Sequence, residues 1–471
     1  MATFSSLNVI LQAMMTNQTA IQVIEHNVAN ASTPGYRRQQ AVIVSAPPAM
    51  INNLRASGSG SIGSGSMVQK IMRYGNEFFD TRFRKENAEA KRYAITRDIL
   101  QQTEMILGEN TTSGLLPTLD AFFSSWQALS ADPSNMALRE SLRDQASMVA
   151  TAFSTRATDI KRLQGDQDLT IQTRVEEVNS LAASVASLNS RISTALGMGD
   201  QPNDLMDERD RLLDRLSEIT GATSHLQEDG QVIVSINGHW LVTGTQTFEL
   251  QTYRDSNNLL NVQWADNPPP PVSFSPVTGE LRGLFDARDG VLQDQLNRLN
   301  ALATQFITQV NAQHQAGYVL NGASHAPAMF TGTDAFSIKV NDATPPPPSL
   351  SDVANIGAAL TANAIGDGTN AALMAKLKDQ LFMSGGTQTF NAFYSGQVAS
   401  LGLAVRKADA LATDRKYVAD AWKTQRESES GVNLDEEAAS LVKFQRSYQA
   451  AAKMITVVDD LLDRVINGMI R

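Results

Sequence analysis

Two clusters of carboxylates are the part of this sequence best suited to chemistry. They comprise Asp204, Asp207, Glu208 and Asp210, and Asp435, Glu436 and Glu437. Carboxylates that face each other across a cleft hydrolyse glycosidic bonds. The first cluster, however, is interleaved with Arg209 and Arg211 as on a solvated helix face. The second falls in the first turn of a predicted helix, where acids favour the helix dipole. We therefore predict that both clusters are structural and that the chain has no catalytic residue.

Motifs for metals, cofactors and nucleophiles are also missing or weak. The histidines are scattered and form no H-E-x-x-H pair; they are His26, His225, His239, His314 and His325. The absence of cysteine removes thiolate metal sites, Cys nucleophiles and disulfides. A G-x-G-x-x-G spacing at Gly58, Gly60 and Gly63 lacks the preceding strand and following helix that a dinucleotide site needs. We predict no metal, no cofactor and no enzymatic activity.

Composition narrows the partners that the chain can bind. A net charge of -10 and a pI near 5.1 argue against nucleic acid or an anionic membrane as the main partner. The N-terminus predicts no Sec-type signal peptide, and no apolar run reaches the ~20 residues of a membrane-spanning helix. With 42% apolar residues in 471, we expect buried cores and roughly three domains. If the chain leaves the cell, it needs another export route.

Both ends of the chain carry the apolar spacing of a coiled coil. The N-terminal seam alternates in steps of three and four, with one polar residue: Leu7, Ile10, Met14, Asn17, Ile21, Ile24 and Val28. The only formal charge between Met1 and Tyr36 is Glu25, whereas a helix in water usually carries Lys and Glu on its outer face. We expect this helix, from about Ser5 to Ala29, to face neighbouring protein. The alternative is an ordinary buried N-terminal helix.

The C-terminal seam has no polar break. Its residues are Leu441, Phe444, Tyr448, Ala451, Ile455, Val458, Leu462, Val465 and Met469. Asn433 is a predicted N-cap, and Glu436 stands close to the capping-box position. The seam spans about 28 residues, or about 42 Å, and the N-terminal helix spans about 37 Å, so the two can pack side by side. A chain whose terminal helices pair while its middle forms a separate part is typical of a polymer-forming subunit.

The interior predicts long helices around one β-rich insert. The helical segments are 76–107, 115–129, 136–163, 171–196, 204–219, 284–316, 371–382 and 391–428. Alternation in Gln231–Ile236, followed by the hairpin signal Asn237-Gly238, predicts a small β domain. The predicted fold is mainly α, with paired terminal coiled-coil helices, a long-helix bundle from both halves of the chain and a β insert. Its domains are 1–60 with 429–471, 61–221 with 284–428, and 222–283.

Two motifs beside the seams point to a family. The stretch 27–37, NVANASTPGYR, resembles the N-terminal signature of bacterial flagellar rod, hook and hook-associated proteins. The stretch 433–437, NLDEE, with Phe444-Gln445 and Tyr448-Gln-Ala450, resembles their C-terminal signature. The motif residues are Asn27, Asn30, Thr33, Pro34, Gly35, Tyr36, Asn433, Leu434, Glu436 and Glu437. Interior stretches such as 279–288, GELRGLFDAR, resemble the member of the family that joins hook to filament.

This resemblance implies a secreted structural subunit at the junction of hook and filament, exported unfolded by the flagellar type III apparatus. It implies a ring of copies of the chain that contacts the hook protein and a second junction protein (hook-associated protein 3). It also implies a cytoplasmic export chaperone that holds the C-terminal segment. The alternatives are a hook or distal-rod subunit, whose relatives lack a long helical interior, and a cell-wall hydrolase that travels with the flagellum. The β insert and residues 325–390 lie outside the similarity.

Overall fold

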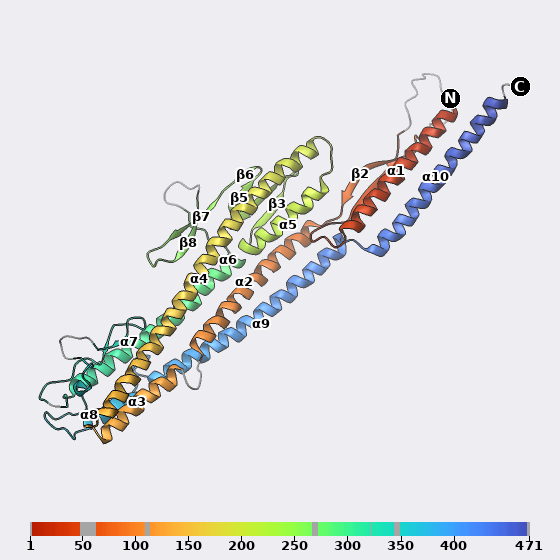
Figure 1. The fold of residues 1–471 in the computed structure, drawn as a ribbon. Helices are drawn as coiled ribbons and strands as arrows, with labels where there is room; N and C mark the ends of the chain where they lie inside the picture. Colours follow the sequence, from red (N-terminus) through yellow and green to blue (C-terminus); the bar gives the residue numbers. More distant parts are fainter. Residues whose placement is uncertain are drawn as a thin grey trace.

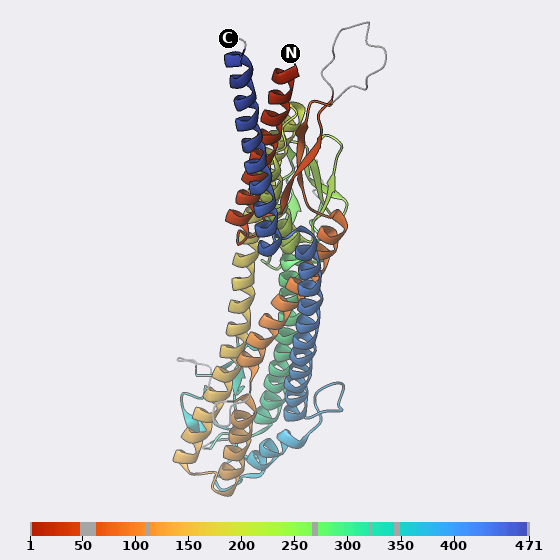
Figure 2. The same ribbon diagram turned by 90° about the vertical axis from the view of Figure 1, so that its right-hand side faces the viewer.

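The computed structural model describes residues 2–47, 63–108, 114–265, 272–320, 322–342 and 349–468. The glycines Gly58 and Gly60 and the seam residue Met469 lie outside these ranges. The molecule is elongated, and its two termini lie together at one end (Figure 1 and Figure 2). The predicted fold class is confirmed, because the chain is mainly helical with small sheets inserted in the middle.

Long helices from both halves of the chain run together along the molecule. The described α-helices are α1 (Ala2–Asn30), α2 (Glu77–Leu107), α3 (Leu115–Ala131), α4 (Met136–Gly197), α5 (Asn203–Thr220), α6 (Glu280–Phe285), α7 (Gln293–Ala316), α8 (Thr369–Lys376), α9 (Phe390–Ser430) and α10 (Leu434–Gly468). Helix α1 lies beside α10, and α2 lies beside α9 (Figure 1). We call the part from α2 to α9, with the β insert, the body.

Helix α4 is one helix of 62 residues, although the sequence predicted two, at 136–163 and 171–196. The apolar stripe does stop between these segments, but buried Gln164 and Asp168 continue it with polar side chains. Arg288 donates from Nη1 to Asp168 Oδ1 at 2.7 Å, which satisfies that carboxylate inside the body. A polar stretch of a buried helix face gives no hydropathy signal, so the prediction of two helices was wrong.

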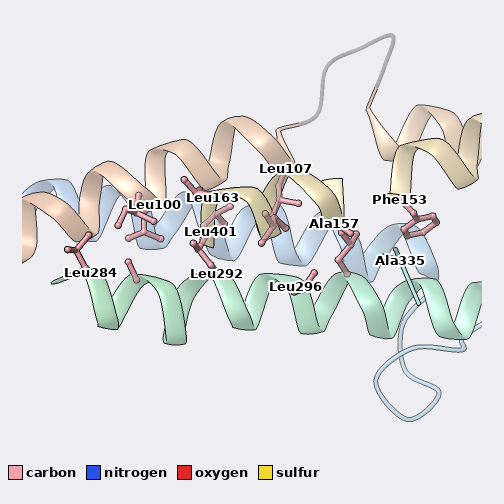
Figure 3. Close-up of a cluster of buried hydrophobic side chains, with 14 of the residues drawn as sticks. Leu100, Leu107, Phe153, Ala157, Leu163, Leu284, Leu292, Leu296, Ala335 and Leu401 are labelled. Atoms are coloured by element: carbon pink, nitrogen blue, oxygen red, sulfur yellow. The ribbon is translucent and has the colours of Figure 1, made fainter. Parts of the chain in front are cut away.

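The hydrophobic core lies where the long helices of the body meet. Leu100 and Leu107 of α2 face Leu163 of α4 and Leu296 of α7, with Leu401 of α9 completing the cluster (Figure 3). The same continuous cluster extends to the buried faces of the β insert. Among the described residues it contains none from α1 or α10. The core of the body is therefore built without the terminal helices.

The β insert packs along α4. Its strands are β3 (Thr223–Leu226), β4 (Val232–Ile236), β5 (His239–Thr243), β6 (Gln246–Thr247), β7 (Leu250–Arg254) and β8 (Leu260–Trp264). They form an antiparallel sheet in the order β3-β4-β5-β6 and a separate β7–β8 hairpin. The predicted Asn237-Gly238 turn is present, with φ of 49° and 86°. Because the insert shares the core of the helices, its division into a separate domain stays a prediction.

Several shorter elements were not foreseen. The strands β1 (Gln39–Ser45) and β2 (Ser66–Arg73) form an antiparallel ribbon beside α1. A π-helical turn, Asp286–Leu292, separates α6 from α7 where one helix was predicted. The strands β9 (Phe330–Thr331) and β10 (Lys339–Val340) pair within the irregular part that follows α7.

A buried histidine fastens this irregular part to α7. His314 has no exposed surface, its Nδ1 lies 2.6 Å from the carbonyl oxygen of Pro327, and its Nε2 accepts from the Gly357 amide at 3.0 Å. These partners require the neutral ring, with the proton on Nδ1 donated to Pro327. Burial, the largest cause, lowers the pKa of His314 from 6.5 to about 4.

This histidine predicts a loss of stability in weak acid. In the unfolded chain His314 is protonated below about pH 6.5, whereas in the folded chain it is protonated only below about pH 4. At about 1.4 kcal/mol per pKa unit, the free energy of unfolding should fall by about 3 kcal/mol across this window. Urea denaturation of the wild type and of His314→Gln at stepped pH measures the effect. The variant should lose most of the pH dependence and the exposed control His225→Gln should keep it; equal slopes in all three proteins would contradict the prediction.

Candidate functional site: the terminal helix pair and its elbow

Helices α1 and α10, which carry the predicted seams, lie side by side. In α1, Ile10 and Ile24 are buried, Leu7, Met14, Asn17 and Ile21 are half-buried, and Val28 is exposed. In α10 the seam side chains that the structure describes are all half-buried: Leu441, Phe444, Tyr448, Ala451, Ile455, Val458 and Leu462. The side chain of Val465 lies outside the described part, as does Met469. Helix α1 lies directly beside α10 in both views (Figure 1 and Figure 2).

A second face of α1 packs on the β1–β2 ribbon. Its buried residues, Thr16, Ala20, Val23 and Asn27, recur at helical spacing beside the seam. The hydroxyl of Thr16 donates to the carbonyl oxygen of Ser66 in β2 at 2.8 Å. The sequence analysis missed this face because β2 was not predicted. The uncharged character of α1 is thus partly explained within the chain itself.

Both terminal helices still leave apolar side chains in solvent. On α1, Leu11 and Met15 are exposed, the latter by 67%. On α10, the exposed apolar residues are Leu434, Val442, Met454, Val457 and Leu461. Apolar surface that continues along a helix pair in this way is typical of a protein contact. The terminal helix pair can therefore contact other protein chains through these exposed side chains.

The polar seam residue Asn17 bonds only within its own helix among the described contacts, donating from Nδ2 to the carbonyl oxygen of Ala13 at 2.8 Å. We expect Asn17→Ile to strengthen the α1–α10 pairing by about 1 kcal/mol, because it removes a half-buried amide and adds apolar contact. Assembly should nevertheless suffer, since a polar seam residue restricts register. Hydrogen exchange of α1 and swimming in soft agar measure the two effects, with exposed Gln18→Ile as control. Normal swimming with unchanged exchange would count against the prediction.

The two motifs meet at a joint that we call the elbow, residues 31–38 and 431–433, where the terminal pair joins the body. Asn27, in the last turn of α1 beside the elbow, is fully buried. Its Nδ2 donates to the Gln39 carbonyl at 2.8 Å and to Glu437 Oε2 at 3.0 Å. Its Oδ1 accepts from the Gln39 amide at 3.0 Å and from the Tyr36 hydroxyl at 2.8 Å. One side chain thereby joins α1, β1 and α10.

The remaining N-terminal motif residues shape the turn that ends α1. Asn30 donates to the carbonyl oxygen of His26 at 3.1 Å, and Thr33 donates from its hydroxyl to Asn30 Oδ1 at 3.2 Å. Gly35, after Pro34, has a φ of +83°, which side chains rarely adopt. Burial and the carboxylates Asp204, Asp207 and Glu437 raise the pKa of Tyr36, so its hydroxyl stays protonated as a donor.

The C-terminal motif starts α10 and contacts the N-terminal one. Asn433 caps the helix, accepting from the Asp435 amide at 3.0 Å, and Leu434 is exposed. Glu436 stands near the capping-box position, but the contact found for its carboxylate is Arg38 Nη1 at 3.0 Å. Glu437, almost fully buried, accepts from Arg38 Nε at 2.7 Å. The acids that the sequence assigned to the helix dipole also bind a cation from the other end of the chain.

In the first carboxylate cluster Asp204 and Glu208 are exposed, so the prediction of a solvated helix face was wrong only for Asp207 and Asp210. Asp207 and Arg209 of α5 are buried. Asp210 lies within 3.0 Å of Arg37, 2.6 Å of Arg73 and 3.3 Å of Arg84. These cations come from the elbow, β2 and α2. The cluster was hidden from sequence reasoning because its partners lie more than a hundred residues away.

The electrostatics of this cluster fit a structural role. Burial raises the pKa of Asp210, but the three guanidinium groups outweigh it and hold that pKa well below the usual carboxyl range. For Asp207 burial outweighs Arg73 and Arg37, so its pKa is raised. Among the described residues no group of His, Asp and Glu is arranged to hold a metal ion. In the same ranges no helix is long and apolar enough to cross a membrane.

The sequence analysis missed Arg37 and Arg38 as site residues. A signal was present, because the chain has no Lys or Arg before these two positions. A first pair of cations that follows a long uncharged segment indicates a change of environment. Their acidic partners at both ends of the chain could not be assigned from sequence alone.

Comparisons with protein families match three parts of the chain. A model described as "Flagellar hook-associated protein FlgK helical domain" matches residues 100–330. A model of the "Flagella basal body rod protein" matches residues 7–37, which contain the N-terminal seam and motif. A model of the "Flagellar basal body rod FlgEFG protein C-terminal" matches residues 424–468, which contain the C-terminal motif and the whole of α10. The helical body and both terminal helices therefore resemble flagellar proteins.

Curated relatives span almost the whole chain. It is 29% identical to flagellar hook-associated protein 1 of Bacillus subtilis, over 99% of each chain. It is 24% identical to flagellar hook-associated protein 1 of Escherichia coli, over 98% of this chain and 99% of that one. The solved structure of the flagellar hook junction protein FlgK from Burkholderia pseudomallei has a similar fold, with a TM-score of 0.65 and 16% identity. That match covers 74% of this chain and all of the other.

Proposed function

Because the chain belongs to the family of flagellar hook-associated protein 1, we propose that it is a structural subunit of the bacterial flagellum at the junction between hook and filament. The observation that carries this proposal is the meeting of both family motifs at the elbow, below a terminal helix pair with exposed apolar side chains. The body has a hydrophobic core of its own, and the terminal helix pair projects from it. Such a chain is suited to polymerisation through the projecting helices.

The partners follow from this role. We propose that copies of the chain form a ring through α1 and α10, between the hook protein on one side and hook-associated protein 3 on the other. We further propose that the chain is exported unfolded by the flagellar type III apparatus, and that a cytoplasmic chaperone holds its C-terminal segment beforehand. The uncharged N-terminal helix supports such a route, because it gains most of its stability only from partners.

A hook or distal-rod subunit is the second candidate. The family models for residues 7–37 and 424–468 name basal-body rod proteins, which favours this reading for the ends of the chain. The helical interior favours the junction, because residues 100–330 match a hook-associated helical domain. We propose no catalytic role, since Asp210 and Glu437, the buried carboxylates beside the elbow, are bound by arginines. A zymogram with purified protein should show no cleared band.

A deletion strain tests the proposal directly. We expect hooks without attached filaments, and flagellin released into the medium. Gold-labelled antibody on wild-type flagella should mark one narrow band between hook and filament. Labelling along the whole hook would support the second candidate instead. Full, firmly attached filaments in the deletion strain would reject both.

A further inference from the structure

We infer that Arg37 and Arg38 together fix the angle between the terminal helix pair and the body. The inference rests on the proposed function, because it names the residues that position the polymerising helices. The two neighbours lie in the elbow, in the segment that connects α1 to β1. Arg37 binds the body, and Arg38 binds the terminal helix pair.

Arg37 is bonded to the body. Its Nη1 and Nη2 donate to the two carboxylate oxygens of Asp80 in α2 at 2.9 and 2.7 Å. The same guanidinium reaches Asp210 of α5 at 3.0 Å. The side chains of Arg37 and Asp80 are less than a tenth exposed. A two-pronged pair of this kind restricts direction as well as distance.

Arg38 is bonded to the terminal pair. Its Nε donates to Glu437 Oε1 at 2.7 Å, and its Nη1 donates to Glu436 Oε2 at 3.0 Å, both in the first turn of α10. Successive side chains of an extended segment point to opposite sides, which sends the two neighbours in opposite directions. Glu437 in turn accepts from Asn27 of α1, so Arg38 reaches both terminal helices through one carboxylate.

The backbone of the same two residues is anchored to the body. The Arg37 amide donates to Asp207 Oδ2 of α5 at 3.0 Å, and the Arg38 amide donates to the carbonyl oxygen of Ser430, the last residue of α9, at 2.8 Å. Only the Arg38 side chain then crosses from this anchored backbone to α10. Removing it should free the angle of α10 while leaving the body and the helix seam in place.

Contacts of the β1–β2 ribbon with α5 hold α1 to the body as well. Helix α10 packs chiefly on α1, and α1 also packs on the ribbon. Arg73 of β2 binds Asp210 of α5 at 2.6 Å, and the Gln39 side chain of β1 donates to Asp204 Oδ1 at 2.8 Å. A direct ionic contact from α1 to α5 joins His26 Nε2 and Asp204 Oδ2 at 3.7 Å, and a long exposed pair of this type contributes little. The ribbon contacts therefore act on α1, whereas Arg38 acts on α10, and every subunit can present its terminal helices at the same angle to its neighbours.

Spin labels across the elbow test the inference. Because the chain has no cysteine, Ser180→Cys in α4 and Ser447→Cys in α10, both exposed, can be labelled alone in the purified full-length protein. We expect one narrow distance distribution in this labelled parent and a distribution at least twice as wide in Arg38→Met. The width of the distribution in Arg38→Lys should be intermediate, because lysine keeps the positive charge but lacks the planar guanidinium group. Arg298→Met, which removes a surface contact to Asp294 of 2.8 Å within α7, should match the parent.

Two outcomes would overturn the inference. One is a distribution in Arg38→Met that is no wider than that of the labelled parent, and the other is an equally wide distribution in Arg298→Met and Arg38→Met. Thermal unfolding should be the same in all variants, because the core of the body lies elsewhere. The distances are measured on purified protein and do not depend on flagellar assembly. A deletion strain with normal filaments would reject the proposed function while leaving the elbow measurement intact.

Discussion

A chain that ends after Gly431 should fold into a soluble body and yet fail to enter the flagellum. The truncation removes α10 and with it Glu436 and Glu437, so α1 loses its seam partner and Arg38 loses both carboxylates. The described core cluster contains no residue of either terminal helix, so the melting temperature of the body should shift by less than about 4 °C. Assembly at the junction should be abolished, which is the largest functional effect we expect.

Complementation of a deletion strain, counted by electron microscopy, measures assembly, and circular dichroism melts measure the body. Because truncation can also prevent export, two full-length variants accompany it. Ile455→Asp places a charge in the half-buried seam, and Thr456→Asp places the same charge at the adjacent exposed position. We expect the first to block assembly and the second to permit it. Recovery of the truncated or Ile455→Asp protein in normal junctions would contradict this account.

The fold was predictable wherever one apolar period extends over many residues. The predicted helices at 115–129 and 204–219 agree closely with α3 and α5, and the Asn237-Gly238 turn has a local steric cause. The predictions were wrong or missing where an element depends on polar contacts with residues far away in the sequence. Gln164 and Asp168 keep α4 continuous through partners far along the chain. The strand β2 forms because β1 and α1 offer it a surface, for which its own residues give little signal.

The candidate site divides in the same way. The motif residues were identifiable because Asn27, Gly35 and Asn433 stand at helix ends and turns, where residue type has a direct conformational meaning. Their mutual contacts were not predictable. The bond from Asn27 to Glu437 joins positions 410 residues apart, and the bond from Arg38 to Glu437 joins positions 399 apart. Spacing within one segment cannot encode a pairing between the two ends of a chain.

The largest stability effect should come from Asp210→Asn. This carboxylate is shared by Arg37, Arg73 and Arg84, whose guanidinium groups come from three different elements. Asparagine keeps the size but removes the negative charge, leaving buried cations with fewer partners. Breaking a buried ion pair in this way costs about 3 to 5 kcal/mol. We expect a loss near the lower figure at pH 7, because the three arginines keep their other carboxylate partners Asp80, Asp207 and Asp214.

The pH dependence of this loss distinguishes lost charge from lost packing. The arginines depress the pKa of Asp210, so its contribution is present above its ordinary pKa of 3.8 and disappears as the pH falls below it. The difference in the free energy of unfolding between wild type and Asp210→Asn should therefore be constant from pH 7 to pH 5 and shrink below pH 4. Asp207, whose pKa is raised, titrates in both proteins with the opposite sign and cancels to first order from the difference. The matched control is Asp294→Asn, which removes a half-exposed contact to Arg298. It should lower the free energy of unfolding by less than about 0.5 kcal/mol. A loss for Asp210→Asn that persisted unchanged at pH 3 would mean that shape, and not charge, accounts for the role of this residue at the elbow.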